Sequence, residues 1–526
     1  FDVDAEFDFS AAELGGHVAI RGEAEISDDM TRLSIAGLNV SGELRGIATE
    51  PAPFNFDSRS MSVNAADGTL DLGEMDLSVL GISMSANVEP FAYSQELQAK
   101  ADLSVAEFSL VEVLQLLGIE PPATADAKAL SRIAFNARAT VTDKQVSFES
   151  MSLDLDDSTM VGMLALPLTE DGAIRFDLNI GSINLDGYMA PPDAAGAARD
   201  EESPDDFELP VEAIRSLNAN GSLKIGRAML SGLEFTNLEL GLRNQDGRLR
   251  LHPLAAELYD GSYNGDVRID AARDVPSISV NEKLDGVNLN SLAKSMFGQS
   301  NVTGKVNATV VLEGAGRNLS TIRQDLDGRL SLELVDGAWE GTDIWHQLRT
   351  ARAMFRQETP PQPVLPARTE FTSVSATGIV TDGIFENNDL KVLLPFLRLQ
   401  GKGFVDLPAG NVDYSVEARV LDKPELMAGV TREELDDFTK TVVPVRISGP
   451  LSSPSIRPDI EAVFRQQVEG AIEEQKQELK NRLFKDLLGG DEAAPAEQPA
   501  DQTEEAEEED LEDQLKKKLL KDLIGR

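Results

Sequence analysis

The chain has 526 residues, of which 48 are Lys or Arg and 91 are Asp or Glu, so its formal net charge is −43 at pH 7. A surface of this sign repels the phosphates of nucleic acids, and we expect no nucleic-acid partner. The absence of cysteine excludes thiol catalysis, disulfides and cysteine-based metal sites. Hydrophobic residues make up 41% of the chain, which is enough for a large apolar surface.

Apolar residues recur at every second position through the first hundred residues, which predicts β-strands with one apolar face. Such pairs are Phe7/Phe9, Val18/Ile20, Leu33/Ile35 and Leu70/Leu72. The chain starts within this pattern, so we expect a membrane anchor or export signal, absent from this chain, to precede it. No run of 18 or more apolar residues is present, so no membrane-spanning helix is predicted.

Short helices interrupt the strand pattern after residue 104. Ala106–Gly118 predicts one helix, ended by its glycine and by Pro121, and Thr124 is placed to cap a second one through Leu130. Strands resume with the alternation around Phe135 and continue to residue 189. Residues 190–208, rich in Pro, Ala and acidic side chains, predict an exposed linker.

The alternation is strongest between Gly221 and Asp270, where turn signals such as Asp246-Gly247 and Asn264-Gly265 separate the strands. We predict that nine aliphatic residues line one face of these strands. They are Leu223, Ile225, Leu238, Leu240, Leu242, Leu249, Leu251, Val267 and Ile269. Flanking helices are predicted over Leu209–Leu217, Leu289–Phe297 and Glu340–Phe355, and strands continue to residue 459.

The C-terminal region has a different composition. Residues 460–488 predict a long helix, residues 489–510 an acidic disordered linker, and residues 511–526 an amphipathic helix. The two helical segments share a Leu–Lys pattern, in Leu479–Gly489 and Leu515–Gly525. We favour a cap or a protein partner for them over a membrane surface, because the neighbouring acidic run weakens attraction to a membrane.

Catalytic and metal-binding motifs are scarce. There is no G-x-S-x-G motif, and His17, His252 and His346 have no metal-ligand spacing. The carboxylates of residues 154, 156 and 157 could hold a calcium ion, but a solvated strand face is the stronger interpretation. We therefore predict no catalytic residue, metal or cofactor, and a protein that is not an enzyme.

Many short strands with one apolar face must bury that face against something. Two packed sheets, a closed barrel or a curved sheet with an inner trough are the possible solutions. We predict a mainly β fold in which a long, curved antiparallel sheet forms an elongated, arch-like apolar groove, with short helices and a helical C-terminal tail. If 25–30 strands form one sheet, it extends roughly 120–140 Å.

Several segments resemble the AsmA family, and the resemblance covers about Ala101 to Asp459. The segments are Leu117–Leu130 (LGIEPPATADAKAL), Arg215–Gly265, Gly328–Arg349 (GRLSLELVDGAWEGTDIWHQLR), Gly403–Val420 (GFVDLPAGNVDYSVEARV) and Val443–Asp459 (VPVRISGPLSSPSIRPD). The resemblance implies a bacterial envelope protein with a periplasmic body anchored in the inner membrane. It also implies a β-groove that holds acyl chains, and a role in outer-membrane assembly and phospholipid traffic.

The domain interpretation follows from these observations. Residues 1–104 and 105–189 are groove segments, 209–459 the AsmA-like groove, and 460–526 the tail that offers contacts to envelope proteins. We expect a non-enzymatic conduit whose ligands are phospholipid acyl chains. The alternatives are a structural envelope protein with a closed β-core, in which the nine residues are ordinary core, and, less favoured, a hydrolase.

Overall fold

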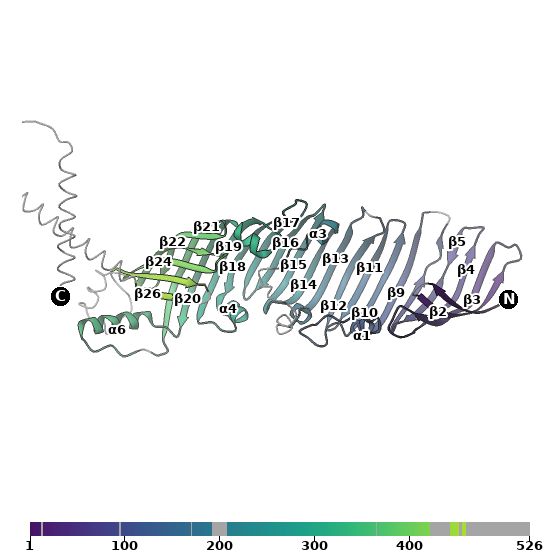
Figure 1. The fold of residues 1–526 in the computed structure, drawn as a ribbon, viewed down its shortest axis with the longest axis horizontal. Helices are drawn as coiled ribbons and strands as arrows, with labels where there is room; N and C mark the ends of the chain where they lie inside the picture. Colours follow the sequence, from purple (N-terminus) through teal and green to yellow (C-terminus); the bar gives the residue numbers. More distant parts are fainter. Residues whose placement is uncertain are drawn as a thin grey trace, which may run out of the picture. The chain divides into compact units, whose positions relative to one another are not determined.

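The computed structural model describes residues 1–458, except 12–13, 94–95, 170, 192–207, 364, 421–441 and 452–454. The chain divides into two compact units, unit 1 (Phe1–Phe385) and unit 2 (Glu386–Arg526). Both units are built mainly from β-strands (Figure 1). The helices predicted for residues 460–488 and 511–526 lie outside the described residues, and the division into smaller domains stays a prediction.

The strands of unit 1 follow one another along a single open sheet (Figure 1). They are β1 (Asp2–Ala11), β2 (Leu14–Ile26), β3 (Arg32–Arg45), β4 (Ala52–Asn64), β5 (Thr69–Asp71), β6 (Gly73–Val79), β7 (Ile82–Val88), β8 (Phe91–Ala92), β9 (Gln98–Phe108), β10 (Ile133–Thr142), β11 (Gln145–Leu155), β12 (Ser158–Pro167), β13 (Ile174–Asn184), β14 (Ala219–Leu230), β15 (Leu233–Gln245), β16 (Arg248–Leu258), β17 (Gly261–Asp270), β18 (Ser277–Asn288), β19 (Val302–Ala315), β20 (Asp327–Glu340) and β21 (Arg368–Thr381).

Consecutive strands pair in antiparallel register from β1 to β4 and from β9 to β13. Between these runs, β4 pairs with both β5 and β6, and β6 with β7, which pairs with β9. From β14 to β21 each strand is again antiparallel to the next. The predicted open, mainly β fold is thus confirmed.

The prediction of a purely antiparallel sheet is wrong at one junction, because β13 and β14 run parallel, with Leu178 opposite Leu223. For two consecutive strands to run parallel, the chain must return from the end of the first strand to the level at which that strand began. This connection takes a dozen or more residues. The 3-10 helix η1 (Leu185–Tyr188) and helix α3 (Val211–Ser216) flank this return. The predicted linker over residues 190–208 falls on it, mostly outside the described residues.

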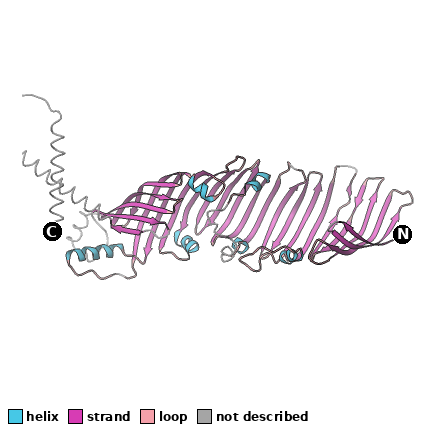
Figure 2. Ribbon diagram, in the orientation of Figure 1, coloured by secondary structure: helices cyan, strands magenta, loops and turns pink. Residues whose placement is uncertain are grey.

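The α-helices described in unit 1 lie where strands end (Figure 2). They are α1 (Leu110–Leu116), α3, α4 (Leu289–Phe297), α5 (Leu319–Gln324) and α6 (Ile344–Arg356). Helix α1 starts later than predicted because β9 continues to Phe108, and Ser109 caps the helix by accepting a hydrogen bond from the Glu112 backbone NH. The helix predicted from Thr124 to Leu130 is wrong, since those residues form turns.

Unit 2 contains a smaller antiparallel array. Strand β22 (Ile384–Leu393) begins at the boundary between the units, and β23 (Leu397–Asp406), β24 (Asn411–Val420), β25 (Val442–Pro450) and β26 (Ser455–Pro458) follow. The pairs β23–β24, β24–β25 and β25–β26 are antiparallel. Leu394, Leu397 and Val416 are buried.

Candidate functional site

All nine predicted lining residues lie on one face of the unit 1 sheet, here called the inner face. The register places Leu223 opposite Leu240, Ile225 opposite Leu238, Leu242 opposite Leu251, Leu251 opposite Val267, and Leu249 opposite Ile269. Residues directly opposite each other in a sheet point to the same side. Strands β14 to β17 therefore bring the nine side chains together into one continuous aliphatic surface.

This surface is neither sealed nor fully exposed. Ile225 is buried, with 6% of its surface exposed, and the other eight residues are half-buried. The alternating residues Lys224, Glu239, Arg250 and Arg268 are exposed on the opposite, outer face. The shielding of the inner residues comes largely from neighbours in the same sheet, because the helices pack at strand ends.

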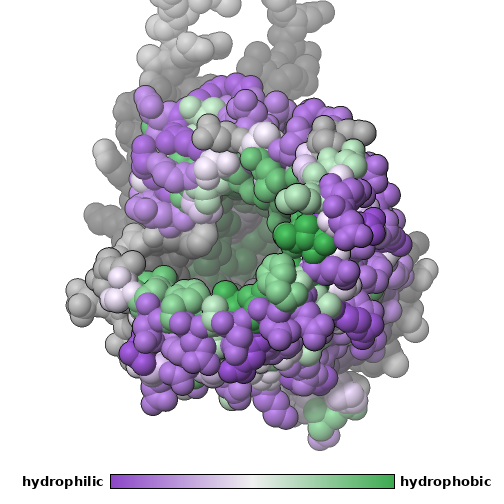
Figure 3. Space-filling view, turned by 90° about the vertical axis from the view of Figure 1, so that its right-hand side faces the viewer, coloured by the Kyte–Doolittle hydropathy of each residue, from purple (hydrophilic) through white to green (hydrophobic). Residues whose placement is uncertain are grey.

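The apolar inner face continues along the other strands of unit 1. Near its start Phe7 pairs with Val18, and near its end Leu332 pairs with Ala376. At the end of unit 1 where β1 lies, Figure 3 shows a hollow with a hydrophobic wall and a largely hydrophilic outer surface. Phe7 is 48% exposed. At this end the inner face therefore lines an open apolar hollow, called the groove.

Ion pairs occupy the outer face of the same strands. The Asp266 carboxylate accepts hydrogen bonds from Arg250 at 2.8 Å and from Arg268 at 2.7 Å. These two guanidinium groups hold the pKa of Asp266 well below its usual range. Lys224 lies 3.5 Å from Glu239 across the β14–β15 pair. The outer face is thus suited to water, although Val161 and Met163 are exposed on it.

The helices described in unit 1 cover the inner face at its margins. Val211 and Ile214 of α3 form a buried cluster with Ala271, against which Leu249 and Ile269 pack. At the other strand ends Leu258, Val287 and Val306 form a buried cluster, and Leu289 and Leu292 of α4 pack on it. Of the nine predicted residues, Leu249 and Ile269 thus belong partly to a core. The same holds for Ile225, which clusters with Ile180, and for Leu223 and Leu238, which pack against that cluster.

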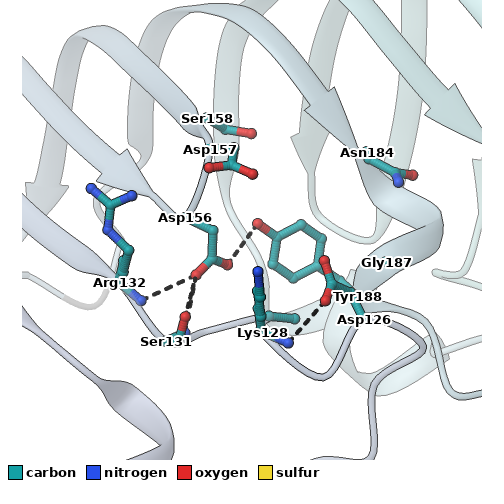
Figure 4. Close-up of a pocket in the computed structure, with 11 residues that line it drawn as sticks. Asp126, Lys128, Ser131, Arg132, Asp156, Asp157, Ser158, Asn184, Gly187 and Tyr188 are labelled. Carbon is teal, nitrogen blue, oxygen red and sulfur yellow. Dashed lines mark hydrogen bonds between the residues drawn. The ribbon is translucent and has the colours of Figure 1, made fainter.

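Asp156, one of the carboxylates considered for a calcium site, binds backbone and side-chain groups of neighbouring loops (Figure 4). Asp156 accepts hydrogen bonds from the backbone NH groups of Leu130, Ser131 and Arg132, at 2.8 to 3.1 Å, and from the Tyr188 hydroxyl at 2.9 Å. Burial alone raises the pKa of this carboxyl, but the hydrogen bonds outweigh burial and leave it lowered. Burial and Asp156 raise the pKa of Tyr188 to about 12.

Asp156 is therefore a loop anchor rather than a residue on a solvated strand face. It lies in the turn between β11 and β12 and ties the loop before β10 to η1, beside a cavity of about 300 Å³. Asp154 instead accepts a hydrogen bond from Thr159 at 2.6 Å. Among the described residues, no group of three or more His, Cys, Asp or Glu side chains is placed to hold a metal ion.

The histidines do not meet in one site. His17 lies 3.1 Å from Asp8 on the outer face of the β1–β2 pair, and His252 is exposed on β16. His346 lies in α6, where its backbone NH donates to Asp343 at 2.8 Å. None of the helices in the described ranges is long and apolar enough to span a membrane.

A long open sheet with one apolar face and a mainly polar one, whose described helices lie at strand ends, defines an elongated, mainly β protein. The model of the AsmA family matches residues 65–390, so the chain belongs to the AsmA family, whose members are bacterial envelope proteins. Protein AsmA of Escherichia coli (strain K12) is 24% identical over 332 residues, which cover 60% of this chain and 53% of that protein. The match thus spans about half the length of the relative.

Proposed function

We propose that this protein is a non-enzymatic lipid conduit of the bacterial envelope, in which acyl chains lie along the inner face and headgroups stay toward water. The observation that supports this most is the half-burial of the aliphatic surface around Leu240, Leu242, Leu251 and Val267. A sealed core would bury these side chains. Here they keep apolar area that a guest can cover.

The energetics favour a hydrocarbon guest. Each methylene moved from water into apolar surroundings gains about 0.8 kcal/mol, so an acyl chain gains several kcal/mol from part of its length. The inner face of unit 1, from β1 to β21, extends roughly 85 Å along the sheet at about 4.8 Å per strand. That length is several times that of one extended acyl chain. A lipid could therefore occupy several successive positions along the inner face, as transfer requires.

The membership in the AsmA family supports a role in outer-membrane assembly and phospholipid homeostasis. We propose a periplasmic body attached to the inner membrane by an anchor outside this chain. The C-terminal residues 460–526 are the proposed contact region for other envelope proteins. None of these roles needs proton transfer or metal chemistry, which agrees with the scarcity of catalytic motifs.

Extraction of the purified protein with organic solvent, followed by mass spectrometry of the extract, tests the conduit. We expect co-purified phospholipid, and uptake of a fluorescent phospholipid by lipid-stripped protein. Repeated absence of both would overturn the conduit and favour a structural envelope protein with a closed core.

A further inference from the structure

One charged side chain interrupts the apolar inner face. On the described strands of unit 1, the inner-face residues that are paired with a neighbouring strand are uncharged. The exception is Glu282 on β18. Its neighbours across the sheet are Gly265 on β17 and Val310 on β19, and along its own strand Val280 and Leu284 share its face. A carboxylate in such surroundings is costly unless it has a partner.

The carboxylate of Glu282 is incompletely satisfied. Its Oε2 atom is buried and makes no hydrogen bond in the structure. The adjacent Lys283 does not neutralise it, because that side chain is on the outer face and donates to Asp285 at 3.0 Å. By contrast, the outer-face carboxylate of Asp266 is paired with two arginines. Glu282 thus keeps one carboxylate oxygen without a hydrogen-bond partner, packed against Gly265 on the inner face.

Two neighbours shape the space around this acceptor. Gly265 lies directly beneath it, and a Cβ atom at that position would overlap the Glu282 carboxylate and crowd the Tyr263 hydroxyl. Burial, and next a hydrogen bond from the Tyr263 hydroxyl to the Glu282 carboxylate, raise the pKa of Tyr263, so its hydroxyl stays protonated. A glycine, a phenol and a carboxylate therefore form one polar position within an aliphatic wall.

The position lies between the two helix-capped margins of the sheet. The cluster around α3 contains Ile269, further along β17, and the cluster around α4 contains Leu284, two residues from Glu282 on β18. A lipid passing along the groove at β17 and β18 has apolar wall on both sides of this one acceptor. The acceptor can therefore act on the polar part of a lipid while the chains keep their apolar contacts.

We propose that Glu282, with Tyr263 and Gly265, forms a recognition site for the primary ammonium group of a lipid. The inference rests on the proposed conduit function and adds selectivity to it, because at this one position the headgroup, which elsewhere stays toward water, turns into the groove. An ammonium group donates charge-assisted hydrogen bonds to the unpaired carboxylate oxygen, and these are stronger than neutral ones. A headgroup with negative charge and no ammonium is repelled there.

The test uses lipid-stripped full chain, incubated with vesicles of equal parts phosphatidylethanolamine and phosphatidylglycerol, and mass spectrometry of the bound lipid. We expect phosphatidylethanolamine to be enriched over the vesicle composition. Glu282→Gln keeps the shape and removes the charge, and we expect it to lower the bound ratio of the two lipids about tenfold, with the total unchanged. Glu239→Gln, on the exposed outer face, is the matched control and should keep the wild-type ratio.

The outcomes separate the two proposals. If wild type, Glu282→Gln and Glu239→Gln bind lipid in the same ratio, the ammonium site is overturned and the conduit stands. If wild type binds no lipid, both are overturned. Glu282→Leu gives a further check, because a recognition site predicts a lost preference with total lipid as high as in wild type. A fall in total lipid with the preference intact would contradict the site.

Discussion

The inner-face apolar residues of strands β16 to β18 and of the turns at their ends differ in burial, according to whether a helix covers them. At the strand ends, Val287 and Ala271 are each 0% exposed, beneath α4 and α3 respectively. Between these ends Leu251, Val267 and Val280 are half-buried, although they belong to the same strands and face the same side. The same alternation of residues thus produces sealed core at the margins and accessible wall between them.

The comparison shows that the apolar pattern of a strand does not by itself decide whether its face is core. A helix of six to nine residues, such as α3 or α4, is long enough to seal the end of a few strands. It is too short to cross the groove. The described helices therefore seal the margins of the sheet and leave its middle half-buried.

The largest expected effect is at a sealed margin. Val287→Arg places an unpaired charge among Leu258, Val306 and the residues of α4, where there is no access to water. We expect a loss of at least about 4 kcal/mol in the free energy of unfolding, or failure to fold. Urea denaturation followed by circular dichroism measures it. A loss below about 1 kcal/mol would show that this end of the sheet is open.

The matching change in the middle of the groove is Leu240→Arg. Its side chain is half-buried and can extend toward water, so we expect a much smaller loss of stability, about 1 kcal/mol. Binding of a fluorescent phospholipid should fall strongly, because a charge then lies among the acyl-chain contacts. Leu240→Met is the conservative control. If Leu240→Arg unfolds the protein as Val287→Arg does, the inner face is a sealed core.

Much of this arrangement was predictable from the sequence. The period-two alternation predicted that nine residues share one face, and the register places them on one face, whereas their role as a lipid-groove lining stays a prediction. The helix over Leu289–Phe297 was predicted with its observed bounds, since Asn288 caps its start and Gly298, with φ +74°, ends it. Local signals of this kind reside in a few neighbouring residues.

The features that were missed depend on contacts between distant residues. The parallel β13–β14 junction follows from the path of a long connection, which leaves no period in the sequence. Asp156 was assigned to a strand face because it follows the alternation of Leu153 and Leu155, whereas φ +51° at this residue turns it into the loop. Glu282 is in phase with Val280 and Leu284, so the alternation puts it on the apolar side, but its contact with Gly265 and Tyr263 depends on the register between two strands.

At the turn between β11 and β12, a carboxylate stabilises the strand end in place of a helix. Asp156→Ala removes the acceptor for three backbone NH groups, and we expect a loss of about 1–3 kcal/mol. Hydrogen exchange at Leu130 to Arg132 should accelerate, while Asp154→Ala, at the neighbouring exposed pair with Thr159, should leave those amides protected. Unchanged exchange in Asp156→Ala would rule out the anchor role.

The same anchor predicts an acid dependence. Because the pKa of Asp156 is lower in the folded state than the ordinary value of about 3.9, its contribution is present above that value and declines as the pH falls through the folded-state pKa. The stability difference between wild type and Asp156→Asn should therefore shrink below about pH 4. A difference that grows toward acid pH would contradict the assigned hydrogen bonds.

The smallest effect is expected on the outer face, directly behind the groove wall. Asp266→Asn removes the charge shared by Arg250 and Arg268, whose side chains are 46% and 59% exposed, so solvent already screens much of the attraction. We expect a loss of about 1 kcal/mol or less at low salt, and a smaller loss at high salt. Lipid binding should not change, because the Asp266 side chain lies on the outer face, whereas Gly265 and Val267 lie on the inner face. A clear loss of bound lipid in this variant would mean that the two faces are not independent. It would contradict the proposal that inner-face residues contact lipid while outer-face residues contact water.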